Sequence, residues 1–282
     1  DSAGIAILNG GLQRLRSTGR VVELEKLTVG RSAPIGIAHT RWATHGVPSE
    51  RNAHPQVSGG VSVVHNGIIE NHDDIREQLQ ARGYEFTSDT DTEVIAHLVR
   101  DKLAGGAQLF EAVCQATQAL EGAYAIAVIN EGDPDLMVVA RHGAPLLLGL
   151  GDGENFAASD ASALVQVTQR MVYLEDGDRA CVGRTAIRIH DASGKLADRP
   201  VQISQLSAES EDLGQYRSYM QKEIFEQPMA VANTLEMVTG ANTIVAELFG
   251  ADAAAVAKQN LVIMAGVGGP AQRREVVADA LL

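Results

Sequence analysis

Short apolar runs rich in β-branched residues recur through the first two hundred residues, and polar turns separate them. Such runs predict strands, whereas apolar residues at helical spacing predict helices. The predicted strands are 4–8, 35–39, 61–65, 123–129, 136–140, 146–150, 172–174 and 186–190. The predicted helices are 73–82, 92–103, 109–120 and 216–238, with Thr90 or Asp91 as the N-cap of the second. Because the helices are grouped and do not alternate with strands, the pattern favours a layered α+β fold over a doubly wound sheet.

The amino-acid composition changes after residue 203. Residues 204–215 are polar, acidic and poor in apolar side chains, which is typical of a linker, so we place a boundary between a domain at 1–207 and a second part at 208–282. The last stretch predicts a strand, a glycine-rich loop and a helix, and Gly266, Gly268 and Ala271 match the GxGxxA dinucleotide pattern. The acidic residue which that fingerprint also needs would fall beyond residue 282, so we expect no nucleotide and no other cofactor.

Charge and composition exclude several classes of function. The 282 residues include 23 Lys and Arg against 36 Asp and Glu, a net charge of −13, which argues against nucleic acid and anionic membranes as partners. Apolar runs fall well short of the roughly 18 residues that a membrane span needs. Cys114 and Cys181 each lie in an apolar periodic stretch and form no paired framework, which indicates a reducing compartment and a cytoplasmic location.

Polar residues with catalytic potential concentrate between positions 39 and 93. Trp42 is the only tryptophan, and five of the eight histidines lie between 39 and 72, at positions 39, 45, 54, 65 and 72. Their spacing matches no helical or knuckle-type metal motif, so we expect no metal site. For His39, His65 and His72 we expect strand-end or turn positions satisfied by backbone hydrogen bonds.

The same region contains the groups that hydrolysis of an amino acid's side-chain amide requires. In His-Asn-Gly, the Asn66 amide and the backbone N–H of Gly67 are candidates for an oxyanion hole. Arg41 is a candidate for binding an α-carboxylate and Asp91 for pairing with an α-ammonium group. Asn-Gly is also the commonest hairpin-turn signal, so a purely structural interpretation of Asn66 stays open.

Several motifs in order and at close spacing carry a resemblance to a known family. They are GIAHTRWATHG, NAHP, VVHNGIIEN, SDTDTEVIAHL, GAYAIAVI, ENFAASD and YMQKEIFEQP. Together they resemble the glutamine–fructose-6-phosphate aminotransferases (isomerizing), the glucosamine-6-phosphate synthases. The resemblance implies a four-layer αββα N-terminal nucleophile domain of the class II glutamine amidotransferases, followed by the start of an α/β sugar-isomerase (SIS) domain. It also implies glutamine and fructose 6-phosphate as substrates and a homodimer formed through the isomerase domain.

The resemblance assigns roles to individual positions. Arg41 would bind the glutamine carboxylate, Asp91 its α-amino group, and Thr44 and His45 would complete the pocket. Asn66 and Gly67 would form the oxyanion hole. Trp42 would gate the path of ammonia, and His54 would lie in a mobile loop over the glutamine pocket.

The chain also departs from the family pattern. Members begin with Cys-Gly-Ile and use that cysteine as the nucleophile and its α-amine as the base, whereas this sequence opens at Asp1. Neither Cys114 nor Cys181 has a free amine beside it, so we expect the chain as written to lack glutaminase activity. Two alternatives stay open: the glutaminase domain of another amidotransferase, such as the phosphoribosyl diphosphate type, and a non-catalytic glutamine-binding module. The segment KEIFEQP favours the sugar-isomerase junction over the first of these.

Overall fold

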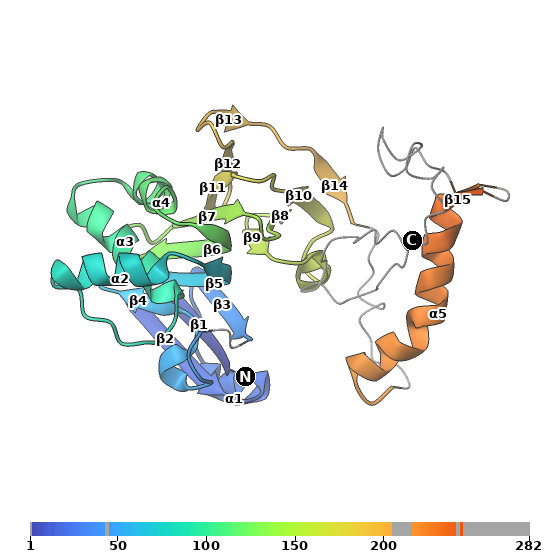
Figure 1. Cartoon of the computed structure of the whole chain (residues 1–282), viewed down its shortest axis with the longest axis horizontal. Coiled ribbons are helices and arrows are strands. Elements are labelled where there is room, and N and C mark those ends of the chain that lie inside the picture. Colours follow the sequence, from blue (N-terminus) through green and yellow to red (C-terminus); the bar gives the residue numbers. More distant parts are fainter. Residues whose placement is uncertain (1, 43–44, 205–215, 241–242, 245–282) are drawn as a thin grey trace, which may run out of the picture. The chain divides into compact units, whose positions relative to one another are not determined.

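The chain divides into two compact units, Asp1–Ala208 and Glu209–Leu282, in a computed structural model (Figure 1). The structure describes residues 2–42, 45–204, 216–240 and 243–244. The linker predicted after Ser204, and the strand, loop and helix predicted around the GxGxxA pattern, lie outside the described residues. Each unit is described below by itself.

A seven-stranded antiparallel sheet forms the centre of the first unit. Its spatial order is β13-β12-β11-β7-β6-β5-β4. In chain order, the strands are β4 (Gln56–Ser58), β5 (Val61–Ile69), β6 (Gly122–Asn130), β7 (Leu136–His142), β11 (Arg179–Gly183), β12 (Ile187–His190) and β13 (Leu196–Ala197). Strands β5 and β6 pair over their whole length, from Val61 opposite Asn130 to Ile69 opposite Gly122.

Three helices cover one face of this sheet (Figure 1). They are α2 (His72–Ala81), α3 (Thr92–Ala104) and α4 (Leu109–Thr117). Ile95 and Val99 of α3 and Leu109 of α4 are fully or almost fully buried, in one apolar cluster with Val63 and Ile126 of the sheet. Burial of such side chains is the main force that holds helices on a sheet face.

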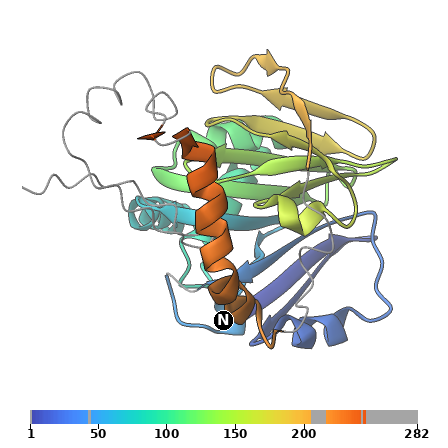
Figure 2. The ribbon, with the colours of Figure 1, turned by 90° about the vertical axis from the view of Figure 1, so that its right-hand side faces the viewer.

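The opposite face of the central sheet packs against two smaller antiparallel sheets, as Figure 2 shows for the blue strands at the start of the chain. One sheet has the order β2-β1-β3, from β1 (Ser2–Leu8), β2 (Leu12–Thr18) and β3 (Ile35–Arg41). The other has the order β14-β10-β8-β9, from β8 (Leu147–Leu150), β9 (Asn155–Ala158), β10 (Arg170–Tyr173) and β14 (Val201–Ile203). Ala6, Ile37 and Leu148 share a second apolar cluster with Ile129 and Val139 of the central sheet.

The α+β class that the pattern predicts is therefore found, with helices on one side of two stacked sheet layers. Of the fourth, helical layer, the described residues contain α1 (Val21–Thr28), which contacts β1 and β2, and a 3-10 turn, η2 (Ala161–Leu164), which packs on β8 and β10. Helix α1 buries only Leu24. Among the described residues, this outer layer therefore consists of one short helix and one 3-10 turn.

The apolar pattern missed the weakly buried β2 and α1, and also the short strands β4 and β11, which are largely buried. Every residue of β2 is half-buried or exposed, and its polar sequence LQRLRST shows no apolar alternation. The second helix of the pattern matches α3 closely, whereas the third ends at Thr117, three residues before its predicted end. Burial on one face, which drives the pattern, is weak in β2 and α1.

The second unit contains the long helix α5 (Tyr219–Val238), with Pro228 inside it, and the short strands β15 (Thr239–Gly240) and β16 (Thr243–Ile244). The helix begins three residues after its predicted start at 216. Within the described ranges, no helix has the length and apolar character to cross a membrane.

Candidate functional site

The sequence-predicted site residues come from four segments that meet where the small β1–β3 sheet lies over strand β5. Arg41 is the last residue of β3, Asn66 and Gly67 lie in β5, and Asp91 precedes α3. His54 follows the 3-10 turn η1 (Glu50–Asn52). Direct contacts join these segments: His39 of β3 to Asn66, and Asp91 to the backbone of β5. The structure thus brings together residues that are up to fifty positions apart in the sequence.

Arg41 is a buried cation whose Nη1 group has no hydrogen-bond partner among the described residues. Its side chain is 5% exposed, and Nη2 donates to the carbonyl oxygens of His45 and Gly46, the latter at 3.0 Å. Nη1 is buried and has no hydrogen-bond partner among the described residues. Burial lowers the pKa of Arg41, and the carboxylate of Asp91 acts in the opposite direction. A fixed guanidinium with a free, buried N–H is suited to binding a carboxylate.

Asp91 occupies the N-cap position of α3, as predicted, but its side chain does not cap the helix. Its backbone is already helical, with φ −63° and ψ −24°, so the carboxylate is not placed to accept from the first turn. Oδ2 accepts instead from the backbone N–H of Ile69 at 2.9 Å and lies 3.9 Å from His65 Nδ1. Asp91 is 4% exposed, so it brings a buried negative charge to the site beside Arg41.

Asn66 and Gly67 do not form a hairpin turn. Strand β5 continues through them to Ile69, and they pair with Ala125 and Tyr124 of β6. Gly67 has φ +126°, and a Cβ at this position would overlap the carbonyl oxygen of Ala123. The hairpin-turn interpretation is therefore wrong. Gly67 instead allows a local distortion of strand β5, because its positive φ is one that other residues rarely adopt.

The histidines of this region are connected mainly through side chains. His39 Nε2 lies 2.6 Å from Asn66 Oδ1, and the Thr92 hydroxyl lies 3.0 Å from both His65 Nδ1 and His54 Nε2. The expectation of backbone hydrogen bonds alone is therefore wrong for His39 and His65. His72 begins α2, and its ring contacts that of His45, with centroids 4.9 Å apart.

His54 lies in the interior and not in a loop over the site. It is 4% exposed, and its ring packs on that of His39 with centroids 4.5 Å apart. Burial, followed by the positive charges of His39, His65 and Arg41, holds its pKa well below the usual value. The expected position of His54 in a mobile loop over the pocket is thus corrected, because its contacts with His39 and Thr92 place it in the interior.

The remaining predicted residues are Trp42, Thr44 and His45. Trp42 follows Arg41 directly and is 86% exposed. Thr44 lies outside the described residues. His45 is half-buried, and its carbonyl oxygen accepts from Arg41.

Glu93, which sequence reasoning did not single out, holds the loop that carries Asp91. Its carboxylate accepts from the backbone and hydroxyl groups of Thr87 and Ser88, at 2.6–2.9 Å. From α2, Arg76 donates to the carbonyl oxygens of Ser88 and Thr90. The loop is therefore fixed from two sides, which places Asp91.

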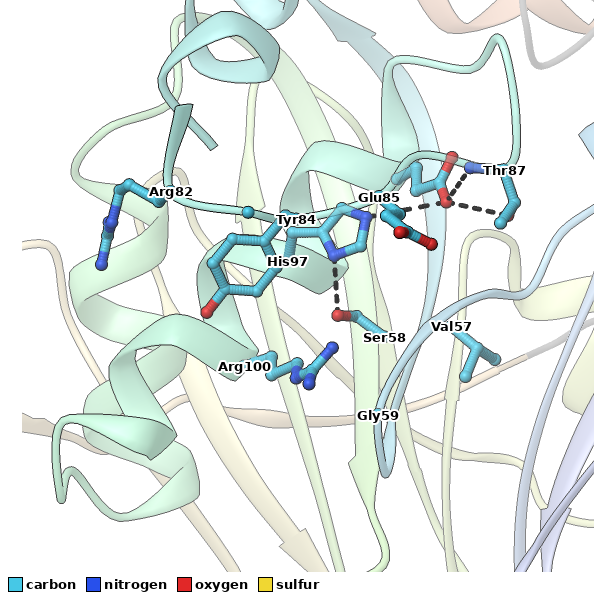
Figure 3. Close-up of a pocket in the computed structure, with 11 residues that line it drawn as sticks. Val57, Ser58, Gly59, Arg82, Tyr84, Glu85, Thr87, His97 and Arg100 are labelled. Atoms are coloured by element: carbon cyan, nitrogen blue, oxygen red, sulfur yellow. Dashed lines mark hydrogen bonds and ion pairs between the residues drawn. The ribbon is translucent and has the colours of Figure 1, made fainter. Parts of the chain in front are cut away.

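A pocket of about 470 Å³ is lined in part by Thr87 of this loop and by Glu93 (Figure 3). None of the predicted site residues lines it. His97 bonds Ser58 Oγ through Nδ1 at 2.7 Å and lies 3.6 Å from Glu93 through Nε2. Ser58, His97 and Glu93 have the residue types of a hydrolytic triad but not its properties. Ser58 is only 3% exposed, and the carboxylate of Glu93 already accepts hydrogen bonds from Thr87 and Ser88. The lining residues are Val57, Ser58, Gly59, Arg82, Gly83, Tyr84, Glu85, Thr87, Glu93, His97 and Arg100.

The two cysteines do not fit the site. Cys114 is half-buried in α4 and Cys181 is buried in β11, and burial raises the pKa of both thiols. A raised pKa disfavours the reactive thiolate. In the part of the chain that the structure describes, no group of three or more His, Cys, Asp or Glu side chains is arranged to hold a metal ion.

Comparisons with known proteins agree with this geometry. A family model described as "Glutamine amidotransferase domain" matches residues 39–166, which contain Arg41, Asn66, Gly67 and Asp91. Among solved structures, a glutamine phosphoribosylpyrophosphate amidotransferase from B. subtilis is similar, with a TM-score of 0.59 and 26% identity. That similarity covers 69% of this chain and 44% of the other. The sheets and helices described above are thus those of a glutamine amidotransferase fold.

Sequence similarity is much higher to one group of curated proteins. The glutamine–fructose-6-phosphate aminotransferase (isomerizing) of Vibrio vulnificus strain CMCP6 is 51% identical over 261 residues, and that of Acidithiobacillus ferridurans is 52% identical over 261 residues. Each similarity covers 91% of this chain, which spans 43% of the length of either relative. On this similarity and the amidotransferase fold, the chain belongs to the glutamine–fructose-6-phosphate aminotransferase family.

Proposed function

We propose that this chain binds L-glutamine and is the part of a glutamine–fructose-6-phosphate aminotransferase that releases ammonia from it. The observation that carries the proposal is the buried Nη1 of Arg41, which has no partner among the described residues, together with the buried carboxylate of Asp91, whose charge acts on Arg41. An amino acid substrate carries a carboxylate and an ammonium group, and both charges need buried partners. Arg41 and Asp91 supply one partner of each sign.

The same geometry supplies a place for the reacting amide. When a nucleophile attacks the amide carbon, the carbonyl electrons move to oxygen, which becomes negatively charged. Donors that are fixed in advance stabilise that charge. The side-chain amide of Asn66 and the backbone N–H of Gly67 are neighbours on β5 and are our candidates for these donors. The pKa values of Cys114 and Cys181 argue against either thiol as the nucleophile.

Fructose 6-phosphate is the acceptor that the comparisons favour. Identity is 51–52% to aminotransferases named for that substrate and 26% to the phosphoribosylpyrophosphate enzyme of similar fold. We therefore propose glucosamine 6-phosphate as the product of the whole protein, in the cytoplasm, with residues 208–282 as the start of a sugar-isomerase domain and a homodimer as the assembly. Sedimentation of the full-length protein tests the dimer.

The exposed Trp42 is our candidate for the residue that gates ammonia. In the full-length protein, Trp42→Ala should leave glutamine hydrolysis intact and lower glucosamine 6-phosphate formation per glutamine consumed. The exposed Tyr173 is a matched control, and Tyr173→Ala should leave that ratio unchanged. If Trp42→Ala forms as much glucosamine 6-phosphate per glutamine consumed as the parent, Trp42 does not gate ammonia.

Glutamine binding to the chain tests the central proposal, because binding needs no nucleophile. Titration calorimetry should detect L-glutamine, and Arg41→Lys should raise its Kd tenfold or more, corresponding to about 1.5–3 kcal/mol for a lost charged hydrogen bond. Arg31 is exposed, and Arg31→Lys should leave Kd unchanged. A folded Arg41→Lys variant with the Kd of the parent would contradict the assignment.

A further inference from the structure

His39 and Asn66 form a hydrogen bond between two different sheets. His39 lies in β3 of the small β2-β1-β3 sheet, and Asn66 lies in β5 of the central sheet. His39 Nε2 and Asn66 Oδ1 are 2.6 Å apart. This contact is the direct link from the strand that ends in Arg41 to the strand that carries the oxyanion candidates.

The bond fixes a tautomer of His39 and an orientation of Asn66. A carboxamide oxygen only accepts hydrogen bonds, so the ring hydrogen of neutral His39 must be on Nε2. His39 Nδ1 is buried without a partner among the described residues, where a lone pair is tolerated better than an N–H. Burial lowers the pKa of His39, the bond to Asn66 opposes this, and Arg41 lowers it further, which favours the neutral ring.

The imidazole of His39 is itself held in place. The His54 ring packs against it at 4.5 Å, and His54 Nε2 is anchored 3.0 Å from the Thr92 hydroxyl. With Oδ1 engaged, the carboxamide of Asn66 must present Nδ2 on its other side. Nδ2 has no hydrogen-bond acceptor among the described residues, which leaves both of its hydrogens for a ligand.

We propose that His39 is a positioning residue that orients the Asn66 carboxamide, so that Nδ2 faces the oxygen on which negative charge develops during glutamine hydrolysis. The inference rests on the proposed function. It adds that a donor is useful only when its direction is fixed before the reaction, because reorientation would reduce the stabilisation of the transition state. Without His39, the two ends of the amide would exchange freely and Nδ2 would face the substrate only part of the time.

The first test is the tautomer, which is read without activity. In nitrogen-15 spectra of this chain, the His39 ring should show hydrogen on Nε2 and none on Nδ1 at neutral pH. Hydrogen on Nδ1 would overturn the inference, whatever the fate of the proposed function.

The second test compares two variants with different donor positions in the full-length protein. Gln places its amide nitrogen near the position of Nε2, whereas Asn places it near that of Nδ1. His39→Asn should lower kcat for glutamine hydrolysis roughly 10- to 100-fold with little change in KM, and His39→Gln should restore most of kcat. A residue that merely joins the sheets would change the melting temperature in both variants and leave kcat per folded molecule intact.

A double-mutant cycle separates the two levels of the argument. Asn66→Ala should lower kcat roughly 10²- to 10³-fold, and adding His39→Asn should then cost almost nothing further. If Asn66→Ala has no effect on kcat, the oxyanion role in the proposed function fails. If Asn66→Ala lowers kcat but the two losses multiply, His39 does not act through Asn66, and only the inference fails.

Discussion

Asp91 binds the backbone of β5 through a single buried hydrogen bond, from the N–H of Ile69 to Oδ2 at 2.9 Å. The carboxylate lies at the start of α3, where the helix dipole favours negative charge, yet it is used to join the helix to the strand. The strand that carries Asn66 and Gly67 is thereby positioned relative to the charge proposed to bind the α-ammonium group.

Two substitutions of Asp91 should separate its structural role from its binding role. Asp91→Asn keeps an oxygen that accepts from Ile69 but removes the charge, so glutamine affinity should fall tenfold or more with only a small loss of stability. Asp91→Ala also leaves the buried N–H of Ile69 without an acceptor, which should cost a further 1–3 kcal/mol or so. Urea unfolding and glutamine titration of both variants measure these effects. Equal affinity for glutamine in the parent and Asp91→Asn would assign Asp91 a structural role alone.

Much of the candidate site could be proposed from the sequence, because the chemistry of the proposed substrate constrains its residue types. A substrate with two opposite charges requires an Arg and an Asp, and the sequence offers Arg41 and Asp91 within recognisable motifs. The central strands and the helices that cover them were predictable, because their buried faces place apolar residues at regular spacing along the sequence. These features depend on local sequence and on the demands of the ligand.

The contacts between segments were not predictable from local pattern. Nothing in the sequence around His39 shows that β3 lies over β5, so the His39–Asn66 bond needed the tertiary structure. The same is true of His54, for which the family resemblance implied a mobile loop, while its contacts with His39 and Thr92 hold it in the core. A buried polar residue is recognisable only once its partners are known.

Gly67 provides a test of the distorted strand. At φ +126° any L side chain is strained, and a Cβ would also overlap the Ala123 carbonyl, so Gly67→Ala should cost at least about 3 kcal/mol. Gly83, at φ +88°, has nothing within 4 Å of its added Cβ. Gly83→Ala should therefore cost only about 1–2 kcal/mol of backbone strain. Equal losses in urea unfolding would show that the contact with Ala123 contributes nothing.

His65 should make the chain sensitive to mild acid. Burial is the main cause that lowers its pKa to about 4, against the opposing effect of Asp91. The unfolded state binds a proton near pH 6.5 and the folded state only near pH 4, so stability should fall as the pH drops through this window, by about 3 kcal/mol. His65→Gln should make the unfolding free energy depend less steeply on pH between 6.5 and 4, and the buried His39 and His54 account for the slope that remains. Exposed His142→Gln should not, and a parent profile that is already flat would contradict the prediction.

Glu93 should act in a separate, more acidic window. Burial alone would raise its pKa, but the contact with His97 and the hydrogen bonds from Thr87 and Ser88 outweigh burial and lower the pKa from 4.5 to about 2. A carboxyl whose pKa is lower in the folded state stabilises the fold above pH 4.5, and that contribution disappears as the pH falls toward 2. The shift corresponds to about 3 kcal/mol.

Glu93→Gln should remove this contribution at neutral pH and also loosen the loop that places Asp91. We therefore expect lower unfolding free energy at pH 7, a flatter profile between pH 4.5 and 2, and weaker glutamine binding. Glu111, in the first turn of α4, is a matched control because its carboxylate serves only its own helix end. If Glu93→Gln destabilises the chain without changing glutamine affinity once folded, the loop is held well enough by Arg76 alone, whose bonds to Ser88 and Thr90 are independent of Glu93.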